Sequence, residues 1–168
     1  MTHITETKET DMASWNHGFL QGQLFMAFRT LVKNYTPNIE LSLDVSKHDL
    51  SKFALGQKDE LKPDVCLYPA EQYRGFKKPY DIVRMFDMPH LAVEIVSPRQ
   101  GIMDLKEKLE VYFHLGIKSC WLILPELEDV TVYQSLTNYK LFSPKHGDTE
   151  IVDDILNIRL PLNKIFEE

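Results

Sequence analysis

The sequence predicts an α/β domain in which helices flank a mixed β-sheet. Apolar residues recur at helical spacing over 15–35 and again over 103–115. Short apolar runs at 64–68, 91–96 and 119–124 have the length and composition of buried strands. Because a helix separates the last two runs, these three elements are expected to form a right-handed parallel crossover.

The remaining elements are predicted from alternation and from cap and turn residues. Residues 39–45 alternate between apolar and polar and indicate a half-buried strand. Ser14 or Asn16 can cap the first helix, and Gly116 directly follows the second. In chain order, the predicted elements are helix 15–35, strand 39–45, loop 47–61, strand 64–68, connection 70–89, strand 91–96, helix 103–115, strand 119–124, a hairpin of 130–134 with 139–142, one or two strands within 151–160, and a helical turn over 162–166.

The length of 168 residues suits one domain. We expect a flexible polar tail over 1–12 and a single domain over 13–168. The net charge of −6 does not by itself indicate a nucleic-acid partner. Residues 50–118, however, contain 11 lysines and arginines and 10 acidic residues. Charge therefore neither indicates nor excludes nucleic-acid binding.

We expect a cytoplasmic protein. No apolar run approaches the roughly 18 residues that a membrane span needs, and the polar start of the chain lacks the apolar region of a signal peptide. Cys66 and Cys120 each lie in an apolar, strand-like run. We expect two buried thiols there, rather than a disulfide or a metal site, which fits a reducing compartment.

Two acidic residues in the predicted strands are candidates for a functional site. Glu94 interrupts an otherwise apolar strand, where an ionised carboxylate is costly unless something pairs with it. Asp64 opens a second apolar run. Taken singly, Glu94 could face water on an edge strand and Asp64 could be a turn residue. If the strands are neighbours, the two carboxylates can share a divalent cation such as Mg²⁺ or Mn²⁺.

Both predicted helices add polar residues of interest. Asp104 and Lys108 are four residues apart and share a helix face, shortly after the strand that contains Glu94. They could also be an ordinary surface pair. His17 lies near the start of the first helix and is either a half-buried imidazole or a group that reaches the same cleft.

These motifs together resemble a large bacterial family of restriction-endonuclease-like proteins within the PD-(D/E)XK nuclease superfamily. The resemblance covers roughly residues 15–135, and the order of the motifs is more specific than any motif alone. The matching segments are Lys62-Pro63-Asp64-Val65, Val93-Glu94-Ile95-Val96-Ser97-Pro98, Asp104-x-x-x-Lys108-x-x-x-Tyr112, Gly116 and Trp121-Leu122-Ile123. The resemblance implies a restriction-endonuclease-like mixed sheet in which Asp64, Glu94 and the backbone carbonyl of Ile95 bind Mg²⁺.

The resemblance also implies catalytic roles on the second helix. The lysine that the superfamily places two residues after the acid would fall at Val96, so Lys108 takes the basic role from the following helix. Asp104 would hold Lys108 or contact a metal-bound water. Three further residues are possible cleft residues, namely His17, which matches a histidine on the family's first helix, Tyr112 and Arg99.

The function implied is Mg²⁺-dependent hydrolysis of DNA phosphodiester bonds by a metal-activated water. Cleavage of both strands of a duplex would favour a homodimer. Two other functions stay open, because a fold does not determine its substrate. One is a catalytically silent module on the same fold that binds nucleic acid or protein, and the other is an enzyme that acts on a different phosphate ester.

Overall fold

The computed structural model describes residues 14–77 and 79–167. Within them, the α-helices and strands are α1 (Trp15–Leu31), β1 (Tyr35–Ile39), β2 (Leu43–Asp44), β3 (Glu60–Leu61), β4 (Val65–Pro69), β5 (Leu91–Ile95), α2 (Ile102–His114), β6 (Ser119–Leu124), β7 (Asp129–Tyr133), β8 (Tyr139–Phe142), β9 (Glu150–Asp153), β10 (Ile158–Pro161) and α3 (Asn163–Phe166). The predicted flexible tail over 1–12 lies outside the described residues.

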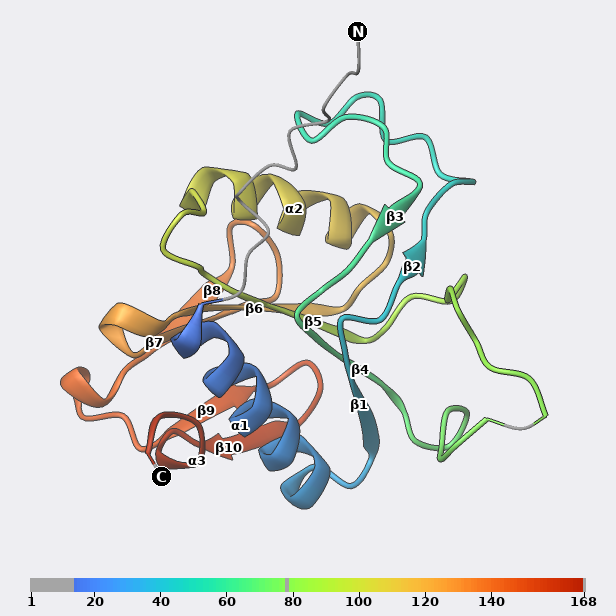
Figure 1. The fold of residues 1–168 in the computed structure, drawn as a ribbon. Coiled ribbons are helices and arrows are strands. Elements are labelled where there is room, and N and C mark those ends of the chain that lie inside the picture. Colours follow the sequence, from blue (N-terminus) through green and yellow to red (C-terminus); the bar gives the residue numbers. More distant parts are fainter. Residues whose placement is uncertain (1–13, 78, 168) are drawn as a thin grey trace, which may run out of the picture.

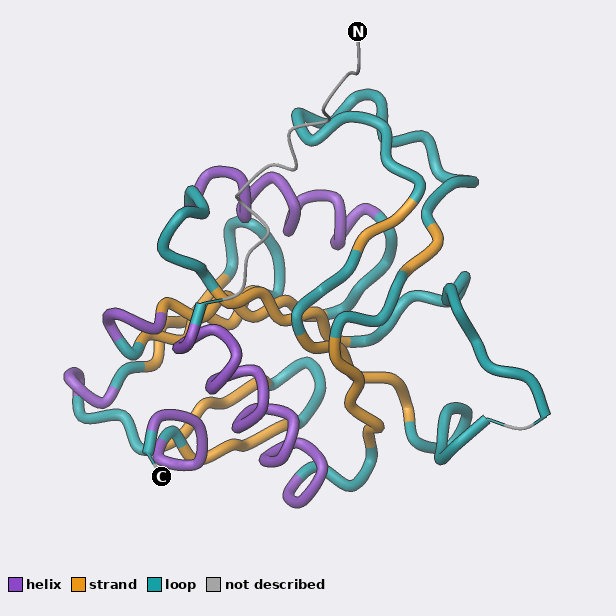
Figure 2. The backbone as a smooth tube through the Cα atoms, viewed as in Figure 1, coloured by secondary structure: helices purple, strands orange, loops and turns teal. Residues whose placement is uncertain are grey.

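The central feature is a six-stranded sheet in the order β1-β4-β5-β6-β7-β8 (Figures 1 and 2). β5 and β6 run parallel, with α2 as the connection between them, and every other neighbouring pair in this sheet is antiparallel. The sequence therefore predicted the parallel β5–α2–β6 unit and the β7–β8 hairpin correctly. The predicted mixed α/β sheet flanked by helices is confirmed.

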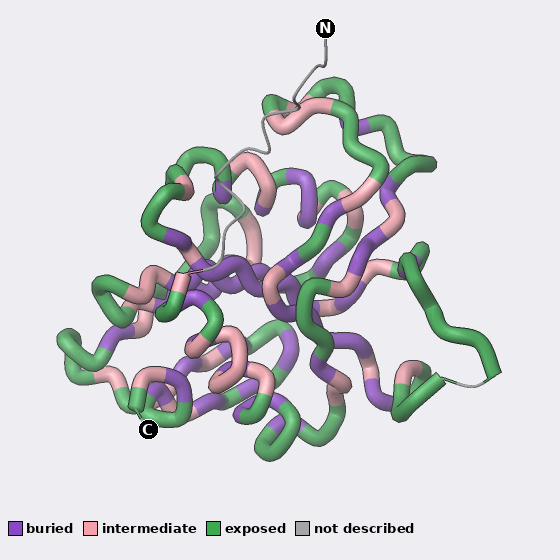
Figure 3. Tube along the Cα trace, in the orientation of Figure 1, coloured by how far each residue is buried: buried purple, intermediate pink, exposed green. Residues whose placement is uncertain are grey.

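The sheet has a different cover on each face. α1, α3 and the β9–β10 hairpin lie on one side, and α2 with the β2–β3 pair lies on the other (Figure 1). Alternation along β5 sends Val93 and Ile95 into the core beneath α1, whereas Ala92 joins the core beneath α2. Because both faces are covered, β5 is buried throughout and β6 is buried up to its last residue, as Figure 3 shows.

The ends of both long helices follow local signals. Ser14 caps α1, and its hydroxyl accepts the His17 backbone N–H at 3.2 Å. After α2, Gly116 takes a φ of +91°, and two backbone N–H groups of the turn bond back to the last helical carbonyls. This is a Schellman ending, which glycine favours because it has no Cβ.

Two of the predicted boundaries are wrong. α1 ends at Leu31 rather than Tyr35, because Tyr35 is already the first residue of β1 and pairs with Pro69 of β4. The single strand predicted over 39–45 is broken by Glu40, whose φ of 49° turns the chain. The alternation in that segment is real, but it belongs to the end of β1 and to the separate short strand β2.

The segments predicted as loops are mostly irregular. Residues 47–61 contain only the short strand β3 at their end, and the connection over 70–89 contributes an isolated bridge between Leu43 and Met85. None of the helices in the described residues has an apolar stretch long enough to cross a membrane.

Candidate metal centre

Asp64 lies at the point where β4 begins, and its carboxylate takes the place of a strand partner. The β4–β5 register pairs Val65 with Val93, so the next antiparallel position would place Pro63 opposite Ile95. Instead, Oδ2 of Asp64 accepts the Ile95 backbone N–H at 2.6 Å. Since this N–H points along the sheet toward β4, the Asp64 carboxylate lies close to the plane of the sheet, at the end of β5.

α1 holds Asp64 from two consecutive turns. Nε2 of His17 lies 3.0 Å from Oδ1 of Asp64. Gln21, one turn later on the same helix face, donates from its side-chain amide to the Asp64 carbonyl at 2.8 Å. Gln21 was not predicted as a site residue, although its spacing of four from His17 was a signal that could have found it.

His17 is buried, with 7% of its surface exposed. Its hydrogen bond to Asp64 raises the pKa of the imidazole, and burial, which acts in the opposite direction, does not cancel this effect. Within the described residues, the Nδ1 atom of the same ring is buried and has no hydrogen-bond partner. Asp64 thus stabilises the protonated form of the His17 imidazole relative to a buried histidine without an acidic partner.

Glu94 occupies the α2 face of β5 and has 1% of its surface exposed. The Tyr112 hydroxyl donates to Oε1 at 2.5 Å, and the Lys108 ammonium lies 3.4 Å from the same oxygen. Burial raises the pKa of Glu94 to about 7; the Lys108 charge opposes this shift, and the negative charge of Asp64 adds to it. Glu94 is thus a buried carboxyl that is poised to ionise near neutral pH.

Asp64 and Glu94 come together because antiparallel neighbours bring the start of β4 to the end of β5. The charge of Asp64 acts on both Glu94 and His17, so the three groups form one electrostatic unit. α1 supplies His17 from one face of the sheet, and α2 supplies Lys108 and Tyr112 from the other. The two acidic side chains named from the sequence thus lie at the same end of neighbouring strands, where the charge of one acts on the other.

The donor set at this end of the sheet consists of oxygens. The N–H and C=O of one strand residue face the same neighbour, so the Ile95 carbonyl is directed to the side on which Asp64 lies. Two carboxylates and a carbonyl are hard ligands that suit Mg²⁺ or Mn²⁺. Among the residues that the structure describes, no three His, Cys, Asp or Glu side chains form a metal cluster. A cation here would complete its shell with water or phosphate oxygens, as Mg²⁺ commonly does.

Two of the predicted residues stand apart from this group. Asp104 lies on the exposed first turn of α2, and no interaction described for residues 14–77 and 79–167 joins it to Lys108 or Glu94. Arg99 lies in the exposed loop between β5 and α2. The structure therefore brings together Asp64, Glu94 and Lys108, with His17 and Tyr112 as their direct partners. Asp104 and Arg99 lie at exposed positions outside this group.

Comparison with known proteins identifies the family and the fold. A family model named Uma2 and described as "Putative restriction endonuclease" matches residues 8–163. The crystal structure of a putative nuclease belonging to DUF820 from Anabaena variabilis ATCC 29413 is similar, with a TM-score of 0.69 and 17% identity, over 94% of this chain and 83% of that chain. No curated protein sequence matches the chain. At this identity, the structural likeness shows that the two chains share a fold.

Proposed function

Because its family model matches residues 8–163, the chain belongs to the Uma2 family, described as "Putative restriction endonuclease", and we propose that it is a metal-dependent endodeoxyribonuclease. The membership and the shared nuclease fold support a nuclease-type function. Mg²⁺ or Mn²⁺ as the cofactor and DNA as the substrate are the further content of the proposal. The buried, unpaired Cys66 and Cys120 support a reducing compartment such as the cytoplasm.

The observation that carries this proposal is the meeting of Asp64, Glu94 and Lys108 at one end of two neighbouring strands. A buried carboxyl with a pKa near 7, next to a second carboxylate, is an unfavourable arrangement that a divalent cation would relieve. The arrangement therefore fits a cation site better than it fits a device for stability.

Each residue has a distinct task in the proposed mechanism. Asp64, Glu94 and the Ile95 carbonyl would hold the cation, which supplies Lewis-acid polarisation of a phosphate oxygen and makes a water more acidic. Lys108, whose ammonium lies 3.4 Å from Glu94, keeps a positive charge where negative charge develops during hydrolysis.

The other residues position the carboxylates. Tyr112 fixes the orientation of the Glu94 carboxylate through its hydroxyl. His17 and the Ile95 N–H each hold one oxygen of Asp64. Asp104, one turn before Lys108 on α2, stays in the proposal as a positioning residue for that lysine.

The test is cleavage of duplex and single-stranded DNA with Mg²⁺ or Mn²⁺, with EDTA as the blank. Asp64→Asn, Glu94→Gln and Lys108→Met should each lower the rate by about 100-fold or more, the usual scale for loss of a group that acts on the transition state. Glu110→Gln changes an exposed acid of α2 and should leave the rate unchanged. Asp104→Asn should have a smaller effect than the loss of Lys108. Full activity in Asp64→Asn or Glu94→Gln would refute the proposal.

A catalytically silent binding module on the same fold is the second candidate. The favouring observation is that each carboxylate already has partners within the chain, Lys108 and Tyr112 for Glu94, and His17 and Ile95 for Asp64. The superfamily lysine is also replaced by Val96. Titration of Mn²⁺ by calorimetry separates the two candidates, because the nuclease must bind the ion and a silent site has no need to.

A further inference from the structure

The outward face of α1 carries an apolar stripe that the proposed function does not use. Trp15 and Met26 have 87% and 62% of their surfaces exposed, and Gly18 and Arg29 on the same stripe are exposed as well. The opposite side of the helix is buried against the sheet. α1 contains no acidic residue, and Arg29 is the one lysine or arginine in it. A helix with so little charge on its outer face is typical of one that is covered by another element.

Two glycines lie in the middle of this stripe. Gly18 and Gly22 are helix-interior positions, where glycine is among the least favourable residues. A Cβ added at either position would meet nothing within 4 Å. The described part of the chain therefore gives no packing reason for either glycine. Close approach by a surface from outside the chain would supply one.

The stripe is symmetric about its centre. Its members Trp15, Gly18, Gly22, Met26 and Arg29 are separated by three, four, four and three residues. An antiparallel copy of the helix that crosses at Gly22 would set Trp15 opposite Arg29 and Gly18 opposite Met26. The first pair matches a guanidinium to an indole face, and the second fits a flexible thioether into the space above a glycine. A surface that complements itself in this way is suited to a two-fold interface.

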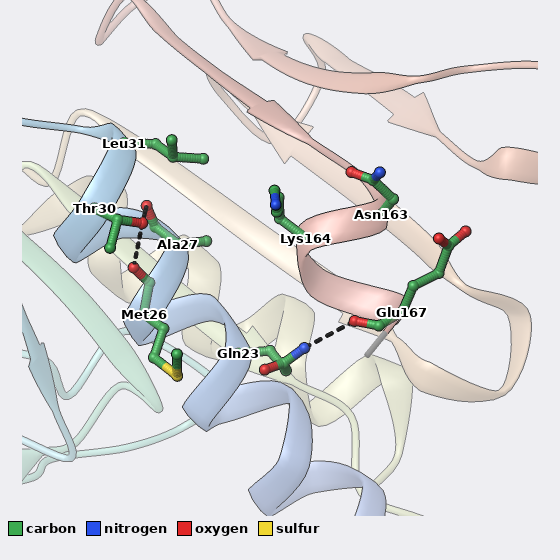
Figure 4. A pocket seen from close by; sticks show the side chains of 8 residues that line it. All are labelled: Gln23, Met26, Ala27, Thr30, Leu31, Asn163, Lys164 and Glu167. Atoms are coloured by element: carbon green, nitrogen blue, oxygen red, sulfur yellow. Dashed lines mark hydrogen bonds between the residues drawn. The ribbon is translucent and has the colours of Figure 1, made fainter.

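A hollow beside the stripe enlarges the surface. It measures about 360 Å³ and lies between α1 and α3, where Met26, Thr30, Leu31 and Lys164 line it (Figure 4). In the antiparallel arrangement, Trp15 of the second copy reaches the Arg29 end of the stripe, next to this hollow. A tryptophan side chain that packs into a hollow is a frequent source of binding energy at interfaces.

We propose that two copies of this chain associate through α1, with the helices antiparallel and crossing at Gly22. The stripe is about 21 Å long, at 1.5 Å per residue. A helix pair of that length alone buries less than the roughly 1,000 Å² of surface that a stable interface needs, and contacts at the α1–α3 hollow add to the buried area. Each copy has a net charge of −6, so the outer face of α1, which has no acidic residue, lets two copies approach with less repulsion than an acidic face would, and the hollow beside it adds one lysine and one glutamate, Lys164 and Glu167.

Sedimentation velocity on the full chain tests the association. The wild-type protein should be a dimer at micromolar concentration, and Trp15→Glu and Met26→Glu should each raise the dissociation constant by 100-fold or more. Both side chains are mostly exposed, so neither change should impair folding. Gly22→Leu should also weaken the dimer, because it adds bulk at the crossing point. Glu110→Lys alters an exposed residue of α2 and should leave the dimer intact. A monomeric wild type, or a dimer that Trp15→Glu leaves unchanged, would overturn the proposal.

Cross-linking tests the register. Gly22→Cys places a new thiol at the two-fold axis, within disulfide reach of its own copy, whereas the native Cys66 and Cys120 are fully buried. Mild oxidation should give a covalent dimer at least ten times faster than with Glu110→Cys. A mixture of Gly18→Cys and Met26→Cys should cross-link faster than either alone, and equal rates in all these samples would refute the register. Neither experiment requires nuclease activity, so its result is independent of the proposed function.

Discussion

At Glu94, a carboxyl group stands in a strand whose other residues are all apolar and buried. Leaving such a group ionised without partners would cost several kcal/mol. Tyr112 and Lys108 reduce this cost, but burial still raises the pKa of Glu94 to about 7. Ionisation of Glu94 at neutral pH therefore comes at some expense in stability.

The free energy of unfolding of the metal-free protein should fall between about pH 4.5 and pH 7. The folded state keeps a proton on Glu94 up to about pH 7, whereas the unfolded chain releases it near 4.5, so the folded state binds more protons in this window. The shift corresponds to a loss of about 3 kcal/mol on going from below pH 4.5 to above pH 7. The pKa of His17 is also raised, so its contribution is likewise lost as the pH rises through the folded value, above 6.5.

Thermal or urea unfolding in EDTA at pH 5 and pH 8 measures this loss. Glu94→Gln should remove most of the pH dependence and make the protein more stable than the wild type at pH 8. Glu110→Gln should keep the wild-type slope. Lowered pKa values at Asp44, Asp49 and Glu60 act in the opposite direction, but only as the pH falls through their ordinary values of 3.8, 3.8 and 4.5 and below. A wild-type slope that persists in Glu94→Gln would contradict the assignment.

At the scale of elements, Asp153 ties the β9–β10 hairpin to the central sheet. Its fully buried carboxylate accepts hydrogen bonds from Ser119 and Trp121 of β6, at 2.5 and 2.8 Å. Its other oxygen accepts the backbone N–H groups of Ile155 and Leu156, each at 3.1 Å, within the hairpin turn. One side chain thus satisfies four donors and joins two elements.

Asp153→Ala should lower the free energy of unfolding by about 3 kcal/mol or more, because it leaves several buried donors unpaired. The neighbouring Asp154 is the matched control, since its ion pair with Lys140 at 3.7 Å is mostly exposed to solvent. Asp154→Ala should change stability by less than about 1 kcal/mol. Urea unfolding of the two variants measures the difference, and equal effects would show that Asp153 does not anchor the hairpin.

Element positions were predictable to different degrees. α2 and its end at Gly116 were predicted closely, because periodicity and a glycine past the helix end are local signals. β1 was missed, although Pro37 argued against a helix there. Proline is tolerated in β1 because this strand lies at the edge of the sheet, a fact that depends on the whole topology.

At the scale of the molecule, the candidate metal centre lies where the two layers over the sheet meet. α1 reaches Asp64 from one face and α2 reaches Glu94 from the other, at the same end of β4 and β5. A cation bound there would link both layers and the sheet. It would therefore stabilise the whole fold, because the unfolded chain offers no such assembled site.

Mg²⁺ or Mn²⁺ should accordingly raise the melting temperature of the wild type. A ligand at 100 times its dissociation constant adds about 2.7 kcal/mol. The rise in melting temperature should be larger at pH 8 than at pH 6, since Glu94 must lose its proton to bind the ion. Differential scanning fluorimetry measures the shift. The double variant Asp64→Asn, Glu94→Gln should show none, and an equal shift in that variant would place the ion elsewhere.

Local patterns in the sequence were enough to predict the type of most elements and the parallel crossover around α2. They also identified the acids at positions 64 and 94 as the residues of interest. Periodicity and cap residues act over a few positions, so they can be detected without a fold. Only the tertiary structure decided that Asp64 would replace a strand partner of Ile95, that His17 and Gln21 would hold it, and that Asp104 would lie at an exposed position outside this group. These contacts depend on strand register and on helix packing between distant segments, and no local pattern encodes either.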